Sequence, residues 1–136
     1  YKILKKAYEN GIVMSGLSAG SICWFKGGNS DSRKFKNKKA KLIKVKGLGF
    51  INALCCPHYD VEKGREASLK KMMKKNTGVA IAIDNCAALE VVNKQYRVIR
   101  TKKTANVYKV YWRDGKYYKE LVSVKKNLES LSELLK

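Results

Sequence analysis

Acidic residues are scarce in this sequence: 11 Asp and Glu oppose 30 Lys and Arg, so the formal net charge is +19. Between Lys26 and Lys46 nearly every charged residue is basic, and Asp31 is the one acid. Such an excess is typical of a polyanion-binding patch or of a solvated lysine-rich surface. Lysine heavily outnumbers arginine, whereas base edges and bidentate phosphate contacts favour arginine. The composition therefore argues against nucleic acid as a partner.

Several other features are also missing. The chain has one proline, no apolar run near the ~20 residues that a membrane span needs, and no long apolar core of a signal peptide at its start. None of the four cysteines, Cys23, Cys55, Cys56 and Cys86, is spaced as in a zinc knuckle. We therefore expect no metal site and no membrane partner. The cysteines read as small buried hydrophobic residues in a reducing, cytoplasmic compartment.

The first 85 residues carry the signals of an α/β fold. Helical spacing of apolar residues predicts helices over 3–10, 21–25 and 61–75. Short apolar runs predict strands buried on both faces at 12–14, 53–56 and 79–83. The composition of 27–32 is that of a loop, and the lysine-rich stretch to residue 46 is loop or edge structure. Strands separated by helices indicate a mostly parallel sheet.

The pattern changes after residue 85. Four short runs with strand character follow, at 88–92, 96–101, 107–112 and 117–122, and two of the junctions are hairpin-like turns. A helical leucine stripe over 128–135 closes the chain. We expect one domain over 1–136, with an α/β part at 1–92 and a C-terminal hairpin and helix at 93–136.

The residues Gly16-Leu17-Ser18-Ala19-Gly20 satisfy G-x-S-x-G, the pattern of a nucleophile elbow. The pattern follows an apolar run and precedes an apolar helix, which is the context that the motif requires. Such a turn is strained, and glycines allow its two ends to approach. It also places the hydroxyl at a helix N-terminus, where free N–H groups favour developing negative charge. An ordinary turn with a capping serine is the alternative interpretation.

A serine hydroxyl needs an adjacent base to become a good nucleophile. His58 is the only histidine and directly follows a predicted buried strand, so it and Ser18 are both expected at the edge where parallel strands end. Asp31, in a polar loop, is the best candidate for the acid that orients the imidazole. A structural histidine and a solvated loop aspartate are the plainer alternatives. Three other acids remain options for the third position: Asp60, Asp84 and Glu90.

These segments, together with Pro57-His58-Tyr59-Asp60 and Gly64-Arg65-Glu66, resemble the aspartyl dipeptidase (peptidase E) family, which includes the cyanophycinases. The resemblance runs from about Gly11 through Val92. It implies a three-layer sandwich like that of class I glutamine amidotransferases, with family strands that would precede Tyr1. It also implies a triad of Ser18, His58 and Asp31, although some members use Glu as the acid.

The resemblance further implies that Arg65 binds the acidic side chain of the substrate and that the Ala19 N–H contributes to the oxyanion hole. A helix-surface arginine is the alternative for Arg65. We therefore expect a serine peptidase without cofactor that hydrolyses small peptides next to an acidic residue. A catalytically inactive basic binding module on the same scaffold is the competing hypothesis. A glutaminase is disfavoured because the elbow holds Ser rather than Cys, and a homodimer is left open.

Overall fold

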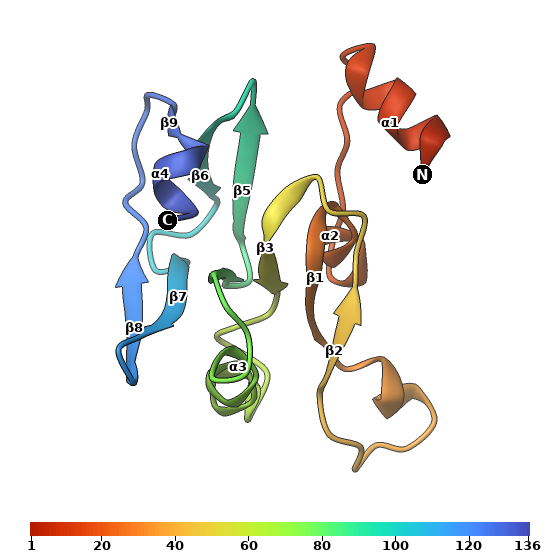
Figure 1. The fold of residues 1–136 in the computed structure, drawn as a ribbon, viewed down its shortest axis with the longest axis vertical. Helices are drawn as coiled ribbons and strands as arrows, with labels where there is room; N and C mark the ends of the chain where they lie inside the picture. Colours follow the sequence, from red (N-terminus) through yellow and green to blue (C-terminus); the bar gives the residue numbers. More distant parts are fainter.

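A computed structural model describes all 136 residues, and its centre is a six-stranded sheet in the order β2-β1-β3-β4-β7-β8. Strands β1, β3 and β4 are parallel to one another, while β2, β7 and β8 pair antiparallel. The fold is thus mixed α/β, with a parallel core and antiparallel strands on both sides (Figure 1). The six strands are β1 Phe25–Ser30, β2 Ile43–Lys46, β3 Ile51–Cys56, β4 Val79–Ile83, β7 Val107–Arg113 and β8 Lys116–Leu121.

A smaller sheet and four α-helices complete the chain. The small sheet has the order β5-β6-β9. Its strands are β5 Ala87–Val92, β6 Gln95–Arg100 and β9 Glu129–Ser130. The helices are α1 Lys2–Glu9, α2 Ala19–Trp24, α3 Arg65–Met73 and α4 Leu131–Leu134, with a 3-10 turn, η1, at Ser32–Phe35. None of these helices has the length and apolar character to cross a bilayer.

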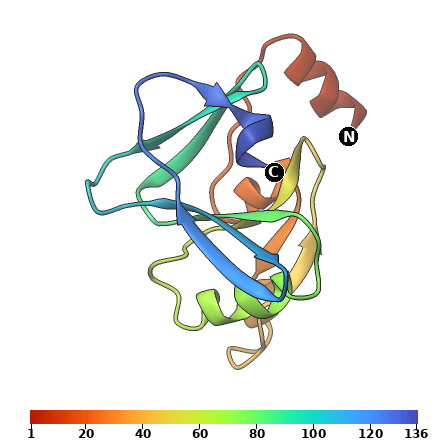
Figure 2. The same cartoon turned by 60° about the vertical axis from the view of Figure 1, so that its left-hand side comes forward.

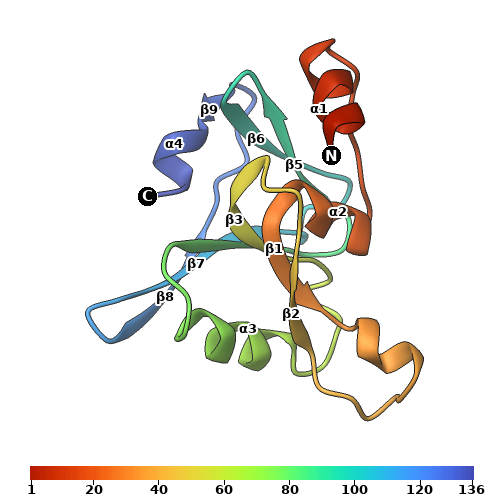
Figure 3. The ribbon, with the colours of Figure 1, turned by 45° about the vertical axis from the view of Figure 1, so that its right-hand side comes forward.

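The elements form three layers. Alternate residues of a strand point to opposite faces. Accordingly Cys55 and Ile81 lie in the core with α2, the small sheet and α4, whereas Leu54 and Ala80 lie in the core with α3. Figures 2 and 3 show α3 (green) on the opposite side of the main sheet from the small sheet. The predicted layering and the antiparallel C-terminal strands are therefore present.

Strand β1 corrects the prediction of a loop at 27–32. Its glycines and polar residues lack strand propensity, yet Gly27 and Gly28 are fully inside the sheet. A Cβ on Gly27 would overlap the backbone oxygen of Val45, and one on Gly28 would overlap that of Cys55. Close packing of the neighbouring backbones requires glycine here. That requirement comes from residues distant in sequence, so composition alone indicates a loop.

The apolar run at 12–14 does not form the predicted strand. Residues 12–17 adopt no regular structure, and Val13 is 89% exposed. Helix α1 has no buried residue, and in Figure 1 (red) it lies apart from the layers, with the extended segment leading down from it. Other predictions are confirmed: β4 matches the strand predicted at 79–83, and in the C-terminal part the β5–β6 and β7–β8 hairpins turn through positive φ angles at Asn93 and Asp114.

The cysteines divide into two pairs. All four are free thiols. Cys55 and Cys56 are fully buried on β3, and burial raises the pKa of each thiol to about 12, so neither is a nucleophile. Cys23 and Cys86 are exposed, which corrects the expectation that all four are buried. Adjacent strand residues face opposite layers, so Cys55 and Cys56 are enclosed by different cores, whereas Cys23 lies on α2 and Cys86 in the turn before β5.

Candidate active site

Ser18 lies at the N-terminus of α2 in a strained conformation, with φ 56° and ψ −118°. A non-glycine residue in such a conformation costs on the order of 1–3 kcal/mol and is characteristic of functional sites. The Ser18 hydroxyl makes no hydrogen bond within the protein, and the Ala19 N–H has no acceptor. A half-buried hydroxyl and a free N–H therefore lie on the same turn, which leads into α2 but, unlike the predicted nucleophile elbow, is preceded by an irregular segment and not by a strand.

The two glycines of the motif differ in their surroundings. A Cβ on Gly16 would overlap the backbone carbonyl of Gly20, so residue 16 must lack a side chain. A Cβ on Gly20 would meet nothing within 4 Å. The expectation that both glycines prevent a clash is thus correct for Gly16 and wrong for Gly20.

The serine turn is tied to strand β3 through Ser21. The Ser21 hydroxyl donates to the backbone oxygen of Ser18 over 2.7 Å and lies 3.7 Å from the Cys55 sulfur. Cys55 is near the carboxyl end of β3, three residues before His58. The turn therefore lies against the strand that leads into His58, although no hydrogen bond joins Ser18 to His58 in this structure.

His58 is held at the edge where β3 and β4 end. It is half-buried with φ 54°, and its Nδ1 lies 2.6 Å from the side-chain oxygen of Asn85. The backbone N–H of Asn85 in turn donates to Asp60 over 2.8 Å, and the N–H of Tyr59 donates to Ile83 over 3.1 Å. An amide oxygen accepts, so this contact suits the tautomer that carries its proton on Nδ1. In that tautomer Nε2 can accept a proton, as a general base must.

Asn85 is the residue that the sequence analysis missed. Its position is the available signal: β3 and β4 are parallel neighbours, so the residues that follow them, His58 and Asn85, meet at one edge. Nothing in its residue type singled it out, because asparagine is common in turns.

Asp31 and Arg65 do not occupy the positions predicted for them. The Arg65 side chain is 1% exposed and donates from Nη1 to the backbone oxygen of Asn29 over 2.9 Å. Its Nη2 pairs with Glu62 and lies 3.7 Å from the Asp31 carboxylate. The guanidinium is thus buried and directed inward rather than facing a crevice. Asp31 contacts Arg65, and Asn85 takes the place at His58 Nδ1 that was expected for it.

Buried charge also occurs next to Asn85. Asp84 accepts the N–H of Asn106 over 3.0 Å, while its other carboxylate oxygen is buried without a partner. Burial raises the pKa of this carboxyl. Glu90, another of the alternative acids, pairs with Arg97 on the small sheet instead. Neither residue contacts His58.

Comparison with known proteins identifies the family of the chain. The sequence model described as Peptidase family S51 matches residues 1–99, which is most of the chain. The chain belongs to peptidase family S51. It is also 37% identical over 110 residues to the uncharacterized peptidase YgaJ of Bacillus subtilis (strain 168). That alignment covers 79% of this chain and 45% of YgaJ.

The S51 match includes every residue of the serine turn and of the edge that holds His58 and Asn85. It ends at residue 99, inside β6, so β7, β8 and the terminal helix lie beyond it. This S51 chain spans less than half the length of YgaJ. The match to the family model thus includes the residues that position the site.

Proposed function

We propose that the protein is a serine peptidase in which Ser18 is the nucleophile and His58 the general base. The observation that carries the proposal is the strained Ser18 turn, with its free hydroxyl and free Ala19 N–H, packed against the strand that leads to His58. Backbone strain of this kind favours a functional role, because a serine that only caps a helix ordinarily has an extended conformation. The family membership supports the same chemistry.

In the proposed reaction the Ser18 oxygen attacks the carbonyl carbon of the scissile peptide bond while His58 Nε2 takes the hydroxyl proton. The negative charge moves to the carbonyl oxygen, where the Ala19 N–H donates to it. His58 then returns the proton to the leaving amine, and the C–N bond breaks to leave an acyl-serine. A water molecule, deprotonated by His58, hydrolyses that ester and restores the hydroxyl.

We assign the orienting position to Asn85 rather than to Asp31. The 2.6 Å contact fixes the imidazole tautomer, as an asparagine does in Cys-His-Asn proteases. A neutral amide does not offset the imidazolium charge that forms during attack. We assign Asp31 a structural role instead: it lies in the loop after β1 and contacts the buried Arg65.

Three finer expectations belong to the same proposal. A preference for acidic residues near the scissile bond is supported by the net charge of +19. A sandwich of the class I glutamine amidotransferase type is supported by the parallel core with helices on both faces. A cytoplasmic location is supported by four cysteines that are all free thiols.

Hydrolysis of an aspartyl dipeptide amide tests the function. Ser18→Ala and His58→Gln should each lower kcat/KM by roughly a thousandfold or more. Asn85→Ala should lower kcat/KM less than these two changes do. Asn85→Asp should give a kcat/KM close to that of the unsubstituted chain. Gly16→Ala should abolish activity because the turn cannot close, whereas Gly20→Ala is the matched control and should stay within a few-fold of the unsubstituted chain.

Two results would contradict the proposal. Hydrolysis that survives Ser18→Ala would place the activity elsewhere. A chain that binds acidic peptides but never hydrolyses them would favour the inactive basic binding module.

A further inference from the structure

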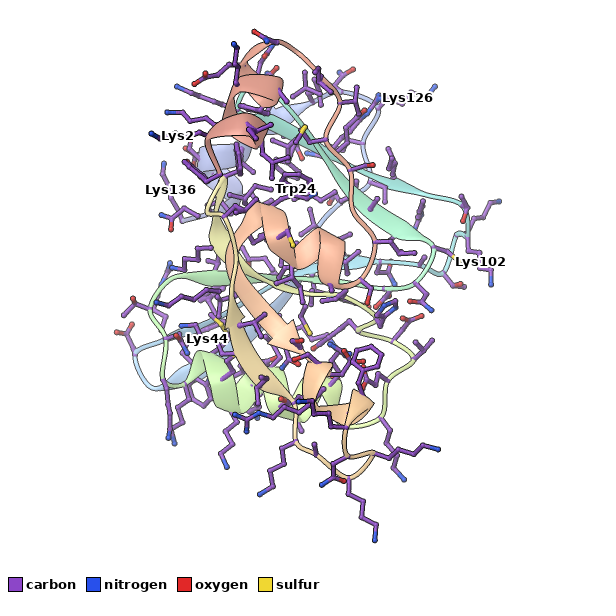
Figure 4. All side chains as sticks on the ribbon, turned by 90° about the vertical axis from the view of Figure 1, so that its right-hand side faces the viewer. Lys2, Trp24, Lys44, Lys102, Lys126 and Lys136 are labelled. Atoms are coloured by element: carbon purple, nitrogen blue, oxygen red, sulfur yellow. The ribbon has the colours of Figure 1, made fainter.

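A groove of about 780 Å³ lies between α3 and the segment that runs from η1 into β2. Lysines make up most of its 15 lining residues, and none of the lining residues is acidic or aromatic. In Figure 4, Lys44 on β2 lies in the lower half of the molecule, and nitrogen-tipped side chains extend below α3 (green) and the loop after η1 (orange). Eight of the 30 Lys and Arg residues of the chain therefore line this one concavity.

Most of these lysines have no partner. Lys34 pairs with Glu62 over 2.6 Å, and Lys44 donates to Asn76. The remaining six form neither an ion pair nor a side-chain hydrogen bond: Lys38, Lys39, Lys41, Lys63, Lys71 and Lys75. Like charges gathered in one groove repel one another and destabilise the free protein. A ligand with several negative charges relieves that repulsion.

The lining favours carboxylates over nucleic acid. Single strands bind by stacking bases on aromatic side chains, and the groove has none. It also has no arginine for bidentate contacts to phosphates or base edges. Lys71 lies in the last turn of α3, and Lys75 lies in the turn that follows the helix. Both line the same wall of the groove, so a peptide with several acidic residues can meet more than one lysine.

The groove adjoins the proposed catalytic edge. Lys63 and Gly64 form part of its wall and directly precede Arg65. The preceding residue, Glu62, donates its N–H to the backbone oxygen of His58 over 3.3 Å. A peptide that reaches the reacting groups can thus continue into the lysines. Because Arg65 is buried and already paired, recognition of an acidic substrate falls to exposed cations, and the groove lysines are gathered beside this segment.

We propose that this lysine groove binds an acidic stretch of the peptide substrate, beyond the residues at the scissile bond. The proposal rests on the proposed peptidase function. It extends the ligand from a small acidic peptide to a longer chain with several Asp or Glu residues.

Binding is measured on the Ser18→Ala chain, which cannot hydrolyse the probe, by fluorescence anisotropy of a labelled hexa-aspartate peptide. The double variant Lys71→Gln/Lys75→Gln should weaken binding by about tenfold or more. Lys39→Gln/Lys41→Gln, on the opposite wall, should have a similar effect and guards against a folding defect in α3. The matched control is Lys102→Gln/Lys103→Gln, which removes the same charge at an exposed turn away from the groove (Figure 4) and should change binding less than twofold.

Equal weakening by groove and control variants would overturn the groove and leave only a general charge effect. Tighter binding of a single-stranded RNA of equal charge than of the peptide would overturn the peptide assignment in favour of nucleic acid. Hydrolysis assays on the unsubstituted chain separate the two proposals. Lost hydrolysis with intact groove binding contradicts the catalytic function alone, and Ser18-dependent hydrolysis with no groove binding contradicts this inference alone.

Discussion

Arg65 and Lys63, one of the groove lysines, are two residues apart, yet the fold treats their positive charges in opposite ways. The Arg65 guanidinium is 1% exposed and is enclosed by Asn29, Asp31 and Glu62. Lys63 and Lys71 are exposed and have no partner. A buried cation must be paired, because desolvation costs several kcal/mol. An exposed unpaired cation keeps its field available to a ligand.

This difference separates structural charge from binding charge. The acids of this region, Asp31 and Glu62, are committed to Arg65 and Lys34. Since the chain has few acids, the other lysines of the groove stay unneutralised. The scarcity of acidic residues thus has a local consequence: the Arg65 guanidinium is fixed in place, and unpaired lysines form a positive groove beside it.

The largest expected effect is on Arg65. Arg65→Met removes the guanidinium and leaves the Asn29 backbone oxygen and one carboxylate oxygen of Glu62 without their donor, which should lower the free energy of unfolding by about 3 kcal/mol. Lys63→Met, a loss of an exposed unpaired cation two residues earlier, is the control and should change it by less than about 0.5 kcal/mol. Urea denaturation followed by circular dichroism measures both. Equal free energies of unfolding for the two variants would show that Arg65 is free to bind substrate. That result would contradict the difference between Arg65 and the groove lysines.

A smaller effect of opposite sign is expected in the groove. Lys39→Gln/Lys71→Gln should raise the free energy of unfolding by roughly 0.5 kcal/mol at low salt, because it relieves repulsion. The gain should vanish near 1 M salt, where the screening length is about 3 Å. Lys34→Gln, which breaks a paired contact on the same wall, should lower stability instead. Destabilisation by both variants would mean that the unpaired lysines are structural.

The smallest effect concerns an exposed pair beside α3. A hydrogen bond from Lys119 lowers the pKa of Glu66, and the Glu66 side chain is 53% exposed. A depressed carboxyl pKa stabilises the fold above the ordinary range near 4.3, and that contribution is lost as the pH falls through the folded-state pKa. Glu66→Gln should therefore lower the free energy of unfolding by about 0.3 kcal/mol at pH 7 and by nothing near pH 2. A difference independent of pH would assign the effect to packing.

Local patterns predicted the elements whose own residues decide their structure. The run Val79–Ile83 is apolar throughout and forms β4, and the turns at Asn93 and Asp114 form hairpins. Local patterns gave wrong predictions where residues distant in sequence determine the structure. Gly27 and Gly28 form a strand because neighbouring backbones approach them, and the apolar run at 12–14 has no partner strand in this chain.

The candidate site divides in the same way. The Ser18 turn is encoded locally, because Gly16, Ser18 and the helix that follows lie within a few residues. His58 could be placed from the strand that precedes it. The partner of its ring could not be predicted in this way. Whether Asp31 or Asn85 reaches the ring depends on which strands are neighbours and on the contact between Asp31 and Arg65. A sequence pattern names residue types, whereas pairing of charges depends on the folded arrangement.

The central claim is that Ser18 is an activated nucleophile. The most direct measurement is to treat the chain with a small neutral fluorophosphonate and locate the adduct by peptide mass spectrometry. The account predicts one adduct, on Ser18, that is lost in His58→Gln and unchanged in Lys71→Gln/Lys75→Gln. An unlabelled Ser18, or an adduct that forms equally fast without His58, would contradict the account.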